Sequence, residues 1–216
     1  MFSNKHSFTK NKEMNVLILL VLFSIFIRVP IVFIFGDEHL QYEWKILVEN
    51  LIEYKQLAWK NCEFAYWITK SCLDDRFLLP NLWMPPLYAY YLYFFTFFNL
   101  EEQNYISLIL SSQILFSSIS VAVFYKINKF FFSKKLSLFS SLLFSLFPLH
   151  AYASSQISSI SLQIFLSILF LYFFFQLIEK RNFLPIVFFS IFWGLLILLR
   201  AEFYAIFILT LLYLFF

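Results

Sequence analysis

The chain has 216 residues, of which 62% are hydrophobic and 24% aromatic, while only 13% carry a charge. Soluble domains average about half apolar and about a quarter charged residues. The composition therefore excludes an ordinary soluble domain and indicates an integral membrane protein. The net charge is +3, and no basic patch indicates a nucleic-acid partner.

Six apolar segments are expected to cross the membrane as helices. The first, residues 15–35, is about 20 residues long, enough for one span. No small-residue cleavage site follows it, so it is interpreted as an anchor and not a signal peptide. The others are expected at 105–127, 136–153, 160–178, 184–199 and from 203 onward. The predicted fold is all-α, a polytopic transmembrane helical bundle that forms a single domain over residues 1–216.

The distribution of charge predicts the topology. Nine basic residues fall in three short segments: the tail before the first span, the four-lysine segment 126–135, and the segment around 179–181. Short basic loops are typically cytoplasmic. Ten of the thirteen acids lie in the longest polar region, residues 36–104. We therefore expect a cytoplasmic N-terminus and an exterior loop over residues 36–104.

This first exterior loop is expected to carry two helices at the membrane surface. Six apolar residues recur at helical spacing with acids largely on the other face, which predicts an amphipathic helix: Leu40, Trp44, Leu47, Val48, Leu51 and Ile52. A second helix should start at Pro85-Pro86 and reach about Phe98, roughly 18 Å at 1.5 Å per residue. That is shorter than the ~30 Å hydrocarbon core. As a span it would also place the four-lysine segment outside the cell, so we interpret it as interfacial.

Asp37 and Glu38 follow the first span directly and are the strongest candidates for catalysis. A carboxylate at a low-dielectric boundary is suited to act as a general base toward an acceptor hydroxyl, to position that acceptor or to bind a metal. The alternative is structural, because acidic residues favour helix N-termini and Asp37 could cap the amphipathic helix.

Two arginines interrupt apolar segments. An arginine inside a span is costly and usually has a partner, so Arg28 is expected to pair with Asp37 or Glu38, to reach a phosphate, or to extend to the nearer interface. Arg200, followed by Glu202, lies at the exterior end of the fifth span. It is expected either to meet the phosphate of a lipid-linked donor or to sit in an ordinary headgroup-level loop.

The two cysteines, Cys62 and Cys72, lie in the exterior loop, where an oxidising compartment would favour a disulfide. A zinc site that also uses His39 and His150 is the alternative, but no tight ligand spacing indicates it. His150 and the serines that follow it are expected either to line a polar cavity or to bond back to their own helix.

The order of these features resembles the polytopic C-type glycosyltransferases. The similarity rests on Arg28, Gly36-Asp37-Glu38 with Tyr42, Pro85-Pro86-Leu87-Tyr88, Pro148 with its serine-rich turn, and Gly194-Leu195 through Arg200. The branch it resembles contains the protein O-mannosyltransferases, the aminoarabinose transferase of lipid A and the RgtA/B/C/D-like transferases. Members are longer, and this chain stops inside an apolar run, so we expect an N-terminal portion of a larger domain, which need not be active by itself.

The resemblance implies transfer of a hexosyl or pentosyl group from a polyprenyl-phosphate donor to a hydroxyl of a lipid, glycan or protein, with inversion at the sugar carbon. It implies catalytic roles for Asp37 and Glu38 and phosphate binding by Arg28 and Arg200. It indicates no definite cofactor and leaves a divalent metal ion as the candidate. The residues expected to line the cavity are Tyr42, Pro86, Tyr88 and His150. The implied location is a bacterial inner membrane, with the active site on the exterior side.

Two other function classes stay open. A carrier or flippase for a lipid-linked precursor would need charges along several spans, whereas Arg28 and Arg200 both lie toward one face. A non-catalytic membrane assembly protein is the other alternative, and the downstream coding sequence would discriminate it from the enzyme.

Overall fold

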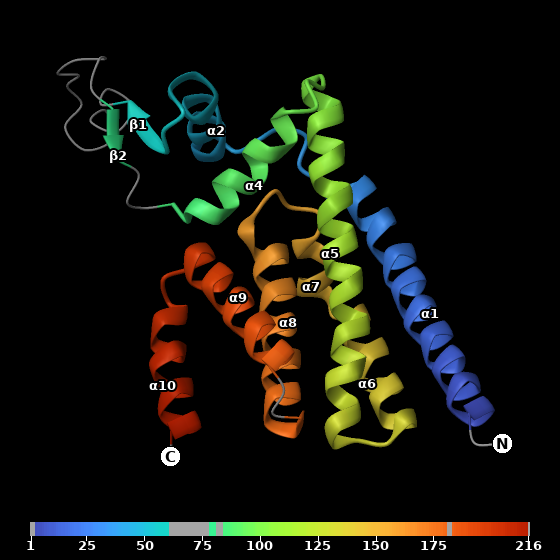
Figure 1. The fold of residues 1–216 in the computed structure, drawn as a ribbon. Helices are drawn as coiled ribbons and strands as arrows, with labels where there is room; N and C mark the ends of the chain where they lie inside the picture. Colours follow the sequence, from blue (N-terminus) through green and yellow to red (C-terminus); the bar gives the residue numbers. More distant parts are fainter. Residues whose placement is uncertain (1–2, 61–77, 81–83, 181–182, 216) are drawn as a thin grey trace.

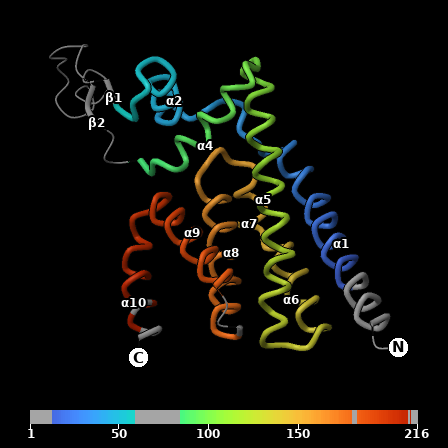
Figure 2. Tube along the Cα trace, viewed as in Figure 1, coloured from blue at the N-terminus to red at the C-terminus, as the bar shows by residue number. Residues whose placement is uncertain are grey.

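The computed structural model describes residues 3–60, 78–80, 84–180 and 183–215 (Figure 1; the same view as a tube is Figure 2). Helices dominate this part of the chain. Three of them are long and apolar enough to cross a membrane: α1 (Ser3–Phe35) from Glu13 onward, α5 (Glu102–Phe131), and α8 (Ser159–Lys180) as far as Glu179. The predicted fold class, a helical membrane bundle, is confirmed.

Four shorter helices complete the bundle. They are α6 (Lys134–Leu146), α7 (Pro148–Ala153), α9 (Phe183–Leu199) and α10 (Phe203–Phe215). The prediction that the third span is one helix over 136–153 is wrong in detail, because α6 and α7 are separate helices. The break lies at Phe147, whose backbone is extended (φ −62°, ψ 116°). Pro148 disfavours a helical conformation at the residue before it, and it then opens α7.

A second layer covers one end of the bundle. Here α2 (Tyr42–Tyr54) and α4 (Pro86–Thr96) lie across the ends of the long helices (Figure 1). These are the two expected helices, and α4 spans only about 16 Å at 1.5 Å per residue. Between them an antiparallel pair of three-residue strands, β1 (Ala58–Lys60) and β2 (Leu78–Pro80), was not predicted.

The main core joins this layer to the bundle. Four residues of the predicted stripe, Trp44, Leu47, Val48 and Leu51, are buried and pack with α4 over α5, α8 and α9. Leu40 precedes α2 and is partly buried, and Ile52 is 47% exposed, so these two depart from the prediction. Trp44 of α2 meets Tyr88 of α4 edge-to-face at 4.7 Å between ring centroids. The surface helices are therefore held by apolar packing against the spans, which fixes the height of the loop that precedes α2.

Serines form the contact between α6 and its neighbours. Ser137, Ser141 and Ser145 recur every fourth residue and are fully buried where α6 packs on α5 and α1. Small residues at this spacing let membrane helices approach closely. This face was not identified from the sequence, although its four-residue period was visible there.

Candidate active site at the end of the first helix

Asp37 is fixed by the loop between α7 and α8. Its backbone N–H donates to the Ser155 carbonyl at 3.1 Å, and its Oδ2 accepts from the Ile157 N–H at 2.7 Å. The Gln156 side chain donates to the Phe35 carbonyl at 2.8 Å, at the end of α1. We call these three contacts the α1 clip. They bind the segment after the first span to a loop about 120 residues later.

The structure excludes one of the roles considered for Asp37, capping of the amphipathic helix. The residue at the N-cap of α2 is Gln41, and α2 begins at Tyr42. Asp37 therefore does not cap the amphipathic helix, and its carboxylate is directed to the α7–α8 loop instead. Its second oxygen, Oδ1, has no hydrogen-bond partner among the described residues.

Gly36 allows the chain to leave α1 at this angle. Its N–H donates to the Val32 carbonyl at 2.8 Å. A Cβ at this position would lie 2.4 Å from the same carbonyl oxygen, closer than such atoms approach. The missing side chain of Gly36 is thus a steric requirement for placing Asp37 one residue later.

A groove of about 680 Å³ runs from Asp37 down between α1 and α5. Its mouth holds Asp37, Glu38 and His39. One wall is the apolar face of α1. The other wall, α5, carries two stripes at four-residue spacing, one apolar (Ile106, Leu110, Ile114) and one polar (Gln103, Ser107, Ser111).

This arrangement gives the groove a graded polarity. Charged groups stand at one end and apolar walls extend toward the middle of the bundle. The hydroxyls of Ser107 and Ser111 donate to carbonyls of their own helix at 2.8 and 2.7 Å. Because these hydrogen bonds are satisfied locally, placing the two hydroxyls in apolar surroundings costs little free energy. Phe33 on the α1 wall is 86% exposed. Such a groove suits a molecule with a polar head and an apolar tail.

Glu38 and its neighbours are more exposed than Asp37. His39 lies 3.5 Å from the Glu102 carboxylate, and both side chains are mostly solvent-exposed, so this pair contributes little to stability. Tyr42, expected to line the cavity, is 61% exposed at the start of α2 and does not line the groove.

Arg28 lies about 14 Å along α1 from Asp37, at 1.5 Å per residue, and is fully buried. It neither pairs with an acid of the described chain nor reaches the surface. Its Nε donates to Ser117 Oγ at 2.6 Å, its Nη2 lies 3.0 Å from His150 Nδ1, and its Nη1 contacts both the hydroxyl and the carbonyl of Ser24. The expected pairing with Asp37 or Glu38 is therefore wrong.

The contacts around Arg28 determine the tautomer of His150. Arginine only donates, so His150 Nδ1 must accept, and Nε2 carries the proton that faces Ser117 Oγ at 3.0 Å. We call Arg28, Ser24, Ser117 and His150 the arginine cluster. It joins α1, α5 and α7 through neutral partners, and it places His150, expected at a cavity wall, in the interior.

Tyr88 and Pro86, also expected to line a cavity, belong to the packing of α4. Tyr88 is fully buried, and its hydroxyl accepts from the Gln113 amide at 3.0 Å. Its neighbour Tyr91 lies 2.5 Å from Ser112 Oγ. Burial raises the pKa of Tyr91 to about 12 and raises the pKa of Tyr88 as well, so both remain neutral phenols. Neither they nor Pro86 line the groove.

Arg200 follows α9 directly, and its side chain lies 3.8 Å from the Glu202 carboxylate. It is partly exposed and does not line the groove. Of the predicted site residues, the groove thus brings together Asp37 and Glu38, while Arg28 and Arg200 lie elsewhere.

A preformed metal site does not fit the described residues. No three histidine, cysteine, aspartate or glutamate side chains converge among them. Cys62 and Cys72 lie outside the described residues, so neither the disulfide nor the zinc alternative is addressed.

Several residues of the site carry little sequence signal. Ile157 contributes only its backbone N–H, which no side-chain pattern can indicate. Ser24 and Ser117 are ordinary helix serines until the fold brings Arg28 to them. The polar stripe on α5 was detectable, because Gln103, Ser107 and Ser111 repeat every fourth residue in an otherwise apolar span.

The chain matches a known protein family over its larger part. The sequence model of a family described as dolichyl-phosphate-mannose-protein mannosyltransferase matches residues 84–216. No curated protein and no solved structure matches the chain. The matched region covers α4 through α10, including the α5 wall of the groove and the α7–α8 side of the clip. It leaves out α1, α2 and the Asp37–Glu38 pair.

Proposed function

The chain belongs to the dolichyl-phosphate-mannose-protein mannosyltransferase family, whose members are membrane glycosyltransferases of the C-type superfamily. We propose that it transfers a sugar from a polyprenyl-phosphate carrier to an acceptor hydroxyl, and that transfer takes place at the mouth of the α1–α5 groove. The observation that carries this proposal is the fixed carboxylate of Asp37. One oxygen is held by the Ile157 N–H at 2.7 Å, and the other is available at the groove.

Asp37 acts as the general base. The acceptor hydroxyl loses its proton to Oδ1 as its oxygen bonds to the anomeric carbon of the sugar. The bond from that carbon to the carrier phosphate breaks, the phosphate leaves with the electron pair, and attack from the opposite face inverts the centre. The hydrogen bond from Ile157 orients the carboxylate, which is the geometric condition for efficient proton transfer.

The groove supports a lipid-linked donor. Its apolar walls suit a polyprenyl chain, and its charged mouth lies where the head of such a lipid meets water. Asp37 and Glu38 are negative, so the donor phosphate needs a cation from elsewhere. Arg200 is the candidate, at the bundle end that α9 shares with α4, while Arg28 would first have to leave the arginine cluster.

The topology is part of the proposal. The N-terminus faces the cytoplasm of a bacterial cell and the groove mouth opens outside it, because the basic segments lie at the opposite end of the bundle. Expressed in intact cells, a reporter tag at exposed Glu101 should react with a membrane-impermeant label. Labelling only after lysis would reverse the orientation.

The deciding experiment measures sugar transfer by the full-length protein in liposomes that contain polyprenyl-phosphate sugars. Asp37→Asn should reduce transfer by about 100-fold or more, since general-base catalysis contributes about 10²–10⁴. Asparagine retains an oxygen for the Ile157 N–H, so the α1 clip persists. Glu101→Gln is the matched control, an exposed acid outside the groove, and should retain full transfer. Unchanged transfer by Asp37→Asn would contradict the assignment.

A further inference from the structure

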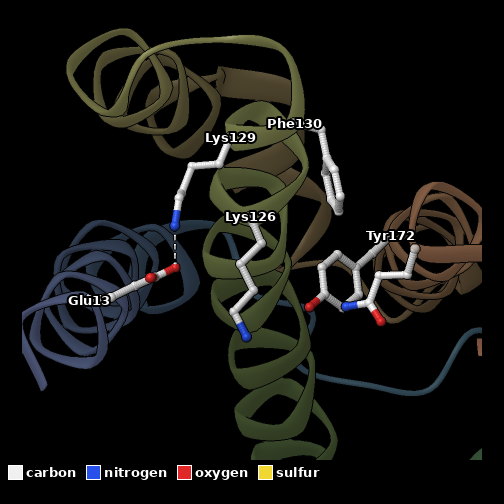
Figure 3. A pocket seen from close by; sticks show the side chains of 6 residues that line it. Glu13, Lys126, Lys129, Phe130 and Tyr172 are labelled. Carbon is white, nitrogen blue, oxygen red and sulfur yellow. Dashed lines mark hydrogen bonds and ion pairs between the residues drawn. The ribbon is translucent and has the colours of Figure 1, made fainter. Parts of the chain in front are cut away.

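A second cleft lies at the end of the bundle opposite Asp37. It occupies about 280 Å³ between the ends of α1, α5 and α8 (Figure 3). We call it the basic cleft, and its lining residues are Glu13, Lys126, Lys129, Phe130, Tyr172 and Gln176. About 36 Å of α1 separates Glu13 from Asp37 at 1.5 Å per residue, so the cleft is distinct from the groove.

The two lysines of the cleft differ in their partners. Lys129 is paired with Glu13, Nζ to Oε1, at 2.5 Å. Lys126, one turn earlier on α5, pairs with no carboxylate of the described chain, and its Nζ lies 5.7 Å from the centre of the Tyr172 ring. Figure 3 shows Lys126 extending from α5 between Glu13 and Tyr172. The cleft therefore holds one positive charge that Glu13 does not neutralise.

Exposed apolar side chains follow the lining residues Phe130 and Glu13 in the sequence. Phe131 and Phe132, at the end of α5, are 59% and 50% exposed. Met14 and Ile18, on the first turns of α1 beyond Glu13, are also about half exposed. Exposed aromatic and aliphatic side chains beside a lysine are typical of the membrane interface, where acyl chains meet headgroups.

From these observations we infer that the basic cleft binds the phosphodiester headgroup of an anionic phospholipid. Lys126 supplies the cation, the Gln176 amide and the Tyr172 hydroxyl supply hydrogen-bond donors, and Phe130 with the exposed apolar side chains next to it in sequence contacts the acyl chains. Basic pockets between membrane helices on the cytoplasmic side bind anionic headgroups in this way. This lipid is a resident of the leaflet at that end and not a substrate of the Asp37 site.

The test is a binding measurement that needs no enzyme activity. The full chain in mild detergent is titrated with phosphatidylglycerol or phosphatidylcholine, and native mass spectrometry counts retained lipids. Phosphatidylglycerol should be retained preferentially, and Lys126→Gln should weaken its binding by about five-fold. Lys134→Gln removes the same charge from the exposed start of α6 and should leave binding within two-fold.

A second pair of variants tests the role of Glu13. Glu13→Gln releases Lys129 and should strengthen phosphatidylglycerol binding by about five-fold. Glu179→Gln removes an equal charge from an exposed site at the same end, where no ion pair of Glu179 with a described lysine exists, and its effect should be smaller. A gain of binding cannot arise from a loss of folding.

Three results of these titrations would overturn the inference, and a competition with inorganic phosphate gives a fourth. The first three are equal retention of the two lipids, equal effects of Lys126→Gln and Lys134→Gln, and equal effects of Glu13→Gln and Glu179→Gln. A competition with inorganic phosphate tests whether the cleft binds a lipid headgroup or free phosphate. If millimolar phosphate displaces the lipid in a Lys126-dependent manner, the cleft recognises soluble phosphate and the lipid assignment fails.

Discussion

The carboxylate of Asp37 accepts a hydrogen bond from the backbone N–H of Ile157, 2.7 Å away in space and 120 residues away in sequence. This bond joins the end of the first span to the loop before α8. It makes the position of the proposed base depend on an element in the second half of the chain. The structural and the catalytic role of Asp37 can therefore be separated by substitution. The structural role needs only a hydrogen-bond acceptor for the Ile157 N–H, whereas the catalytic role needs a group that accepts a proton.

Replacement of Asp37 by alanine or by asparagine should therefore differ in stability. Ile157 is fully buried, so Asp37→Ala leaves its N–H without an acceptor. The expected loss in free energy of unfolding is about 1–3 kcal/mol. Asp37→Asn keeps an acceptor oxygen and should lose less than about 1 kcal/mol by the same principle. Denaturant unfolding in detergent micelles measures both, and equal losses would mean that the Asp37–Ile157 bond contributes nothing.

The two glycines of the chain provide a matched pair. Gly36→Ala places a Cβ against the Val32 carbonyl, so the end of α1 must shift and carry Asp37 with it. We expect lower stability together with a reduced rate of sugar transfer. At Gly194, inside α9, an added Cβ meets no atom within 4 Å. Gly194→Ala should therefore raise helix stability by about 0.5–1 kcal/mol. Thermal unfolding of both variants checks this, and a Gly36→Ala protein with wild-type stability and activity would contradict it.

The arginine cluster should show energetic coupling between Arg28 and His150. His150→Phe removes an acceptor from a buried cation, which should cost about 1.5–3 kcal/mol. In an Arg28→Met background no buried charge remains, so the same change should cost much less. A double-mutant cycle on unfolding free energies measures the coupling, expected above 1 kcal/mol. Additive effects would show that the 3.0 Å contact carries no energy.

The serine face of α6 should tolerate loss of the hydroxyl but not added volume. Ser141 is fully buried, and its hydroxyl donates to the Ser137 carbonyl of its own helix at 2.7 Å. Ser141→Ala should change stability by less than about 1 kcal/mol, because that bond is local. Ser141→Leu should cost about 1–3 kcal/mol or more by overpacking the contact with α5. Similar unfolding midpoints for the two variants would contradict this packing.

The class of the fold and the position of most helices followed from hydrophobic patterning. The spans of α1, α5 and α8 and the two surface helices appear where apolar runs, helical spacing and Pro85-Pro86 indicated them. The proline at 148 was noted, but it was not interpreted as the division between α6 and α7. The strands β1 and β2 were missed because three residues carry too little periodicity to detect.

The site was predicted only in part, for a physical reason. Charge and position at the end of a span indicate Asp37 and Glu38 as candidates. They do not indicate what those carboxylates contact, because the partner of Asp37 is a backbone N–H. Arg28 illustrates the same limit. Its cost in a membrane predicted an acid, a phosphate or the nearer interface as its surroundings, whereas the fold supplies a histidine and two serines.

The arginine cluster has a consequence for the insertion of α1 into the membrane during synthesis. When α1 enters the membrane, Ser117 and His150 have not yet been synthesised, and a central arginine costs about 2.5–3.5 kcal/mol during insertion. Ser24 lies one turn away on the same helix, so it accompanies Arg28 from the start and contacts its guanidinium through both hydroxyl and carbonyl. During insertion Ser24 is therefore the hydrogen-bond partner of Arg28 within the first span. Ser117 of α5 and His150 of α7 become its partners once those helices have been synthesised.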